Sequence, residues 1–158
     1  KLRKYLLRNG VVNMRKGADS IDISVELVNA YKSEKLVSYG FRTAFITVGA
    51  MRNYWEYFSV NYDIQQKKFL KLGDYFILNT RADSANVSSI IYGAVGERNY
   101  GQLTSRPFEV IDDRTDFSIT AGNVYFYFDE FTLAGNPAGL EGSVKRKYIM
   151  NLIQPQYR

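Results

Sequence analysis

Apolar and polar residues alternate along the segment SIDISVELV, which begins at Ser20, and this period of two predicts a half-buried β-strand. Its apolar positions are Ile21, Ile23, Val25 and Leu27. A polar turn, YKSEK, separates this segment from a second long apolar stretch over residues 36–50. Two such segments joined by a short polar turn predict an antiparallel hairpin.

The pattern continues as a meander and then changes its period. Residues 53–64, NYWEYFSVNYDI, predict a third strand, and residues 69–72 predict a short fourth strand. Residues 80–95, TRADSANVSSIIYGAV, begin with cap-type residues and continue with apolar residues at helical spacing. This segment therefore predicts the main helix of the protein.

Strands return after the helix, separated by the turns DDRTD, AGN and AGNPAG. The predicted strands are FEVI at 108–111, FSIT at 117–120, VYFYFDEFTL at 124–133 and SVKRKYIMNLI at 143–153. No linker or internal repeat interrupts the chain. Residues 1–158 thus predict a single α+β domain in which one main helix packs on an antiparallel meander sheet.

The composition removes several kinds of chemistry. The chain contains no cysteine and no histidine, which excludes disulfides, thiolate or histidine metal sites and histidine-dependent nucleophilic catalysis. Any catalysis would have to use carboxylates, lysine, tyrosine or serine. We expect no cofactor and no bound metal.

The net charge of +5 is concentrated in a basic N-terminal arm, residues 1–18. Six basic residues and no acid lie in the first 16 positions: Lys1, Arg3, Lys4, Arg8, Arg15 and Lys16. Such an arm can contact phosphates or an anionic membrane surface, although a solvated tail is the interpretation that we favour. The segments RNYWEYF and VKRKY contain the aromatic and basic residue types that bind single-stranded nucleic acid. Because the rest of the chain is near neutral, we expect no nucleic-acid partner.

Two groups of acids are the remaining candidates for catalysis. The cluster Asp112, Asp113 and Asp116 lacks the spacing of a calcium loop, and Arg114 would oppose a cation, so we interpret it as turn chemistry. In the segment from Asn123 to Gly139, Asp129 and Glu130 are adjacent and would point to opposite faces of a strand. They therefore do not form a catalytic pair.

The same segment predicts one buried and one accessible face. Val124, Phe126 and Phe128 alternate with Tyr125 and Tyr127. The phenylalanine face is typical of a core, and the Tyr-Tyr-Asp face suits a solvent-accessible binding surface.

Three segments in the same order resemble one bacterial family, an extracytoplasmic domain of formerly unknown function. They are residues 36–76, residues 116–139 and the closing SVKRKYIM, so the resemblance covers residues 36–153. The second shows the family's Phe-x-Ile-Thr, its glycine turn and its aromatic strand. The family occurs in lysozyme-sensing anti-sigma factors and in peptidoglycan deacetylases. The chain departs from it at Gly135 and Asn136, where the family has Pro-Tyr.

The resemblance implies a non-catalytic binding or sensor domain in the periplasm or at the cell surface, with a lysozyme-like protein or a cell-wall glycan as its ligand. The expected ligand-binding residues are Tyr125, Tyr127, Asp129, Glu130, Gly135 and Asn136. A carboxylate-dependent glycan hydrolase and a structural module of a surface assembly remain as alternatives. Because the chain begins at Lys1 rather than at a methionine, we expect a processed form whose leader or membrane anchor lies outside this chain.

Overall fold

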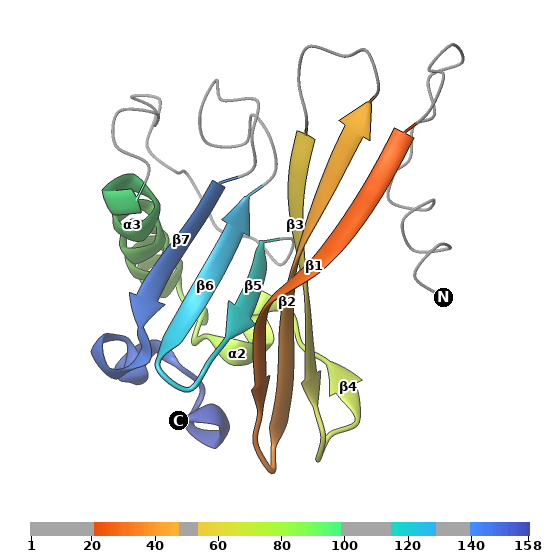
Figure 1. Ribbon diagram of the computed structural model, residues 1–158. Helices are drawn as coiled ribbons and strands as arrows, with labels where there is room; N and C mark the ends of the chain where they lie inside the picture. The colour runs from red at the N-terminus through yellow and green to blue at the C-terminus, as the bar shows by residue number, and fades with distance from the viewer. Residues whose placement is uncertain (1–20, 48–53, 99–114, 129–139) are drawn as a thin grey trace.

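The computed structural model describes residues 21–47, 54–98, 115–128 and 140–158 and shows two antiparallel sheets (Figure 1). The first sheet has the order β1 (Ile21–Lys32), β2 (Leu36–Thr47), β3 (Tyr54–Asp63) and β4 (Lys68–Phe69). The second has the order β5 (Asp116–Ile119), β6 (Asn123–Phe128) and β7 (Leu140–Lys145). The predicted α+β class and the antiparallel pairing are confirmed. The strands divide into two sheets, however, where the sequence predicted one.

The main helix, α3 (Arg81–Arg98), packs against the second sheet. Thr80 and Asp83 exchange hydrogen bonds at its start: each backbone N–H donates to the other side chain, at 2.9 and 3.1 Å. This reciprocal cap fixes where the helix begins. Its buried residues Val87, Ile91 and Val95 recur every four positions, and they join the phenylalanine face of β6 in the core.

A glycine allows the helix to approach β7 closely. A Cβ atom at Gly142 would lie 2.8 Å from the backbone nitrogen of Val95. No side chain larger than a hydrogen atom fits there without moving the helix away from the strand.

Two predicted strand segments have other structures. A one-turn helix, α2 (Leu72–Tyr75), begins where the fourth strand was expected to continue, because the Asp74 carboxylate accepts a hydrogen bond of 2.9 Å from the Lys71 backbone N–H. The predicted strand 143–153 ends at Lys145 and continues as three 3-10 turns. These are η1 (Arg146–Tyr148), η2 (Met150–Leu152) and η3 (Pro155–Tyr157). Ile149, Ile153 and Tyr157 are buried, whereas Asn151 and Pro155, which a continuous strand would place on the same face, are exposed.

A β-bulge in β1 changes the face on which its side chains lie. The pairing with β2 shifts between Leu27, opposite Phe41, and Asn29, opposite Gly40. Because one extra residue reverses the alternation, Asn29 lies on the face that meets the second sheet, and Leu27 lies on the opposite face. The hairpin was predicted correctly, but the bulge was not.

The edge of the second sheet is hydrogen-bonded to side chains of the first. The Ile119 backbone N–H donates to Ser38 Oγ at 2.7 Å, and the Phe117 backbone N–H donates to Ser59 Oγ at 3.2 Å. Asn61 Nδ2 donates to the Phe117 carbonyl at 2.6 Å, and its Oδ1 accepts from Ser38 at 2.6 Å. Buried backbone groups need such partners, so these side chains determine how the sheets meet.

Replacing Asn61 with alanine should strongly destabilise the protein. It leaves the Phe117 carbonyl and the Ser38 hydroxyl without this partner, at a cost of about 1–3 kcal/mol for each buried group. Urea unfolding followed by circular dichroism measures the loss. The exposed Gln65→Ala variant is the control and should unfold at the wild-type midpoint, whereas equal midpoints for all three proteins would contradict this account of the junction.

Replacing Gly142 with alanine should destabilise the protein by about 1–3 kcal/mol, because the added methyl group would overlap Val95. Gly93 offers a matched control, since an added Cβ there meets no atom within 4 Å. The Gly93→Ala variant should be as stable as the wild type or more stable, because alanine favours the helix. Thermal unfolding of both variants distinguishes close packing from a general effect of glycine replacement.

Candidate functional site

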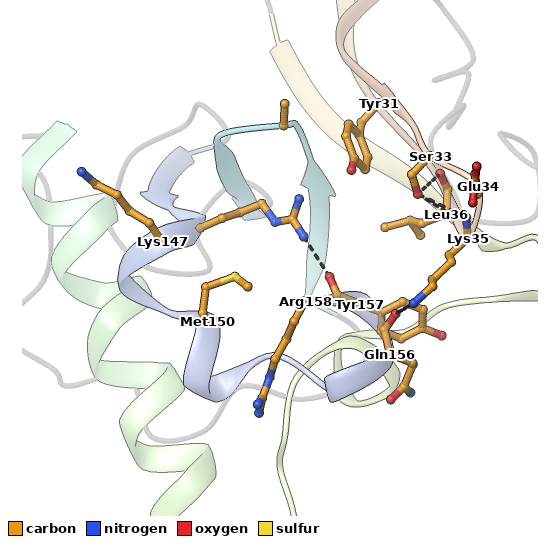
Figure 2. A pocket seen from close by; sticks show the side chains of 12 residues that line it. Tyr31, Ser33, Glu34, Lys35, Leu36, Lys147, Met150, Gln156, Tyr157 and Arg158 are labelled. Atoms are coloured by element: carbon orange, nitrogen blue, oxygen red, sulfur yellow. Dashed lines mark hydrogen bonds between the residues drawn. The ribbon is translucent and has the colours of Figure 1, made fainter.

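A cavity of about 610 Å³ opens between the β1–β2 turn and the three 3-10 turns at the C-terminal end (Figure 2). The β5–β6 turn contributes a third wall through Ala121. The lining residues are Tyr31, Ser33, Glu34, Lys35, Leu36, Ala121, Arg146, Lys147, Met150, Gln156, Tyr157 and Arg158. Segments that are more than 100 residues apart in sequence thus line one site.

The β1–β2 turn is shaped by Ser33. Its backbone N–H donates to the Leu36 carbonyl at 2.8 Å, and its Oγ accepts from the Leu36 backbone N–H at 3.1 Å. Leu36 is buried at the start of β2, so the turn is anchored to the core. Lys35 projects from this turn across the cavity and donates through Nζ to the Gln156 carbonyl at 3.1 Å.

Arg146 is the inner cation of the cavity. Its backbone N–H donates to the Gly122 carbonyl at 2.8 Å, and its Nη2 donates to the Tyr157 carbonyl at 2.8 Å. The guanidinium carbon lies 5.8 Å from the centre of the Tyr31 ring, in a cation–π contact. The Nε atom is buried and has no hydrogen-bond partner. The side chain is therefore oriented, but its hydrogen-bonding capacity is only partly used.

A buried phenol lies close to Arg146. Burial raises the pKa of Tyr75 to about 12, while the positive charge of Arg146 and hydrogen bonding to it act in the opposite direction. The Tyr75 hydroxyl stays neutral at physiological pH. Arg146 is thus contacted by the ring of Tyr31 and lies near an uncharged phenol, and neither group neutralises it.

Tyr157 connects the cavity to the first sheet. Its hydroxyl donates to Asp63 Oδ2 at 2.5 Å, and the Gln66 backbone N–H donates to Asp63 Oδ1 at 2.7 Å. Burial alone would raise the pKa of Asp63, but hydrogen bonds from Gln66, Tyr157 and Gln65 and the charge of Lys68 together hold it below the usual value. Asp63 is therefore charged, 2% exposed and held by its donors, so it does not project into the cavity.

Positive charge predominates around the cavity. Four of its lining residues are basic, Lys35, Arg146, Lys147 and Arg158, and one is acidic, Glu34. The ion pairs Arg42–Glu26 and Lys68–Asp74 both lie elsewhere. Lys147 lies over the ring of Tyr148 and points away from the other labelled residues. The site can therefore attract an anion.

Glu34 is the one carboxylate among the residues that line the cavity. Two carboxylates must face each other across a glycosidic bond to cleave it, and this cavity has one lining carboxylate, Glu34. Across the described ranges there is also no group of three or more acidic side chains that could hold a metal ion.

Tyr127 does not lie where the sequence placed it. It is 2% exposed, so the prediction of an accessible side chain is wrong. Its hydroxyl accepts from Asn29 at 2.7 Å and is 2.7 Å from Ser118 Oγ, while its ring stacks on Tyr57 with centroids 5.1 Å apart. The first sheet covers this face of β6. Alternation within one strand cannot reveal such a cover.

The remaining predicted residues have different outcomes. Tyr125 is half-buried on β6, and the opposite face of Val124, Phe126 and Phe128 is buried as predicted. Asp129, Glu130, Gly135 and Asn136 lie outside the described residues, as do most of the Asp112 cluster, the segment FEVI and the basic arm.

Sequence reasoning missed the cavity because its walls come from separate segments. The only signal was the basic and aromatic segment VKRKY, which contains Arg146 but was assigned to a strand. The 3-10 turns that bring Arg146 to Tyr157 were not predicted.

Comparison with solved structures shows the same architecture in two bacterial proteins. A DUF3298 family member from Bacteroides fragilis NCTC 9343 superposes with a TM-score of 0.62 at 13% identity, over 96% of this chain. A DUF3298 family protein from Pseudomonas aeruginosa PAO1 superposes with a TM-score of 0.58 at 16% identity, over 98% of this chain. The chain has a DUF3298-type fold.

The matching part is a portion of each of these proteins. The chain spans 61% of the Bacteroides protein and 68% of the Pseudomonas protein. No family model matches the sequence, and no curated protein matches it either. The resemblance that the three sequence segments carry is thus confirmed at the level of the fold.

Replacing Tyr157 with phenylalanine should lower the free energy of unfolding at pH 7 by about 1.5–3 kcal/mol, because a buried carboxylate loses a hydrogen-bond donor. The folded pKa of Asp63 is depressed below 3.8, so its stabilisation is present above that value and is lost as the pH falls through the folded pKa. The difference between wild type and variant should therefore shrink below about pH 4.

Urea unfolding at a series of pH values measures this difference. Tyr148→Phe is the control, because Tyr148 is exposed and the substitution keeps its ring beside Lys147. A Tyr157→Phe variant as stable as the wild type at pH 7 would show that the Asp63 hydrogen bond contributes nothing.

Proposed function

We propose that this protein is a non-catalytic binding or sensor domain that acts outside the cytoplasm. The observation that carries the proposal is the open cavity, whose basic residues lack carboxylate partners among the described residues. Side chains left unpaired around a concave site are available for a ligand. The family resemblance of residues 36–153 supports the same role.

The cavity favours binding over hydrolysis. The alternative of a carboxylate-dependent glycan hydrolase requires a facing pair of acids, and Glu34 alone lines this site. If the protein were incubated with peptidoglycan and released new reducing sugar ends, the non-catalytic proposal would fail.

The extracytoplasmic location rests on the resemblance to the extracytoplasmic domain of anti-sigma factors and peptidoglycan deacetylases. Neither of the α-helices within the described ranges is long and apolar enough to cross a membrane.

The charge of the cavity distinguishes the two ligands that the resemblance suggests. A basic lysozyme-like protein would be repelled by Lys35 and Arg146, so it would be contacted at Tyr125 and the segment 129–139. A cell-wall glycan carries free carboxylates on its peptide stems, and these would be attracted to the cavity. We therefore favour the glycan as the cavity's ligand.

Calorimetric titration with a basic lysozyme and with purified muropeptides tests the proposal. We expect at least one of them to bind, and Tyr125→Ala or Asp129→Ala to weaken lysozyme binding if that surface is used. If neither the lysozyme nor the muropeptides bind, the proposed function is wrong. Self-association in sedimentation experiments, with no ligand bound, would instead favour a structural module of a surface assembly.

A further inference from the structure

We infer that the cavity is a site for an oxyanion, a carboxylate or phosphate group on a ligand of small-molecule size, held between Lys35 and Arg146. This inference rests on the proposed binding function and gives the chemical class of the ligand. A cavity of about 610 Å³ is large enough for a disaccharide or a short peptide and not only for an inorganic ion.

The directions of the two cations identify an oxygen-rich ligand. Lys35 Nζ donates to the Gln156 carbonyl at 3.1 Å, and Arg146 Nη2 donates to the carbonyl of the next residue, Tyr157, at 2.8 Å. Two cations from opposite walls thus both donate to backbone carbonyl oxygens of η3. A carboxylate or phosphate group carries several negatively charged oxygens, which are stronger acceptors for such donors than neutral carbonyls.

Both cations retain unused donors. An ammonium has three N–H donors and a guanidinium has five, more than the carbonyls of Gln156 and Tyr157 and the nearby Tyr75 hydroxyl can occupy. A ligand can therefore bind without displacing the carbonyls of η3. The contact of Arg146 with Tyr31 also fixes the guanidinium plane, which reduces the entropy lost on binding.

No acidic side chain of the described chain competes with such a ligand for these cations. Glu34 is exposed on the same turn as Lys35, and no ion pair joins it to either cation. Asp63 is already held by Tyr157 and by the backbone of Gln66. Arg158 adds positive charge, although its Nε donates to the Ile153 carbonyl at 2.8 Å.

Charge-removing substitutions test the site on the full chain. Arg146→Gln and Lys35→Gln should each weaken binding of N-acetylmuramyl dipeptide or of glycerol phosphate about tenfold or more, because each removes a charge-assisted hydrogen bond. Lys32→Gln is the matched control, since Lys32 is exposed on β1 but does not line the cavity. It should bind within about twofold of the wild type.

The set of probes separates the sources of the oxyanion. Binding of the dipeptide identifies a carboxylate ligand, binding of glycerol phosphate identifies a phosphate ligand, and both outcomes support the site. A neutral N-acetylglucosamine dimer should bind at least tenfold more weakly than the better of the two anions. Raising the salt concentration should weaken anion binding and leave the neutral sugar unaffected.

Two outcomes would overturn the inference, and they differ from failure of the proposed function. If the wild type binds a muropeptide and both cavity variants bind it equally well, binding occurs but not here. If the neutral dimer binds as tightly as the anions, the cavity does not select charge. If no glycan, anion or lysozyme binds at all, the proposed function fails as well.

Thermal unfolding shows whether the variants are folded. Arg146→Gln loses the contact with the Tyr157 carbonyl, so its melting temperature is measured before binding is compared. Lys35 lies on an exposed turn, so Lys35→Gln should have the melting temperature of the wild type. Its binding can therefore be compared with that of the wild type even if Arg146→Gln is destabilised.

Discussion

The hydrogen bonds between Asn61, Ser38 and the edge of β5 are the interaction on which the rest of this structure depends. An edge strand presents unpaired N–H and C=O groups, and covering them with apolar side chains would cost free energy. Here the first sheet supplies hydroxyl and amide groups at the required positions. The second sheet can therefore pack by its edge on the face of the first, and β5 is protected from pairing with another chain.

The position of the cavity follows from this junction. With β5 held against β2 and β3, the β1–β2 turn lies beside the segment that follows β7. The buried residues Ile149, Ile153 and Tyr157 then fold that segment back onto the core. Lys35 and Arg146 line the same cavity because the junction holds the two sheets together. Neither residue takes part in the junction itself.

Local patterns in the sequence were sufficient to predict the helices and strands that bury one face. Alternation identified the β1–β2 hairpin, and Thr80 with Asp83 located the start of α3. The phenylalanine positions of β6 were predicted as core because nothing polar interrupts them.

Features that depend on two distant segments could not be predicted in this way. A tyrosine looks amphipathic in a sequence, and whether Tyr127 contacts water or Asn29 depends on a strand 98 residues away. The cavity could not be predicted for the same reason, because Lys35 and Arg146 belong to segments that are far apart in the sequence. The 3-10 turns were missed because the basic and apolar residues of KRKYIM also fit an edge strand.

The bulge in β1 divides this strand into two parts with different evolutionary constraints. Before it, Val25 and Leu27 are 41% and 52% exposed, so substitutions by residues of similar size should be tolerated there. After it, Asn29 and Tyr31 are tied to Tyr127 and Arg146. Loss of one residue at the bulge would turn both side chains to the wrong face. In related sequences, the length of this strand should therefore vary less than its composition.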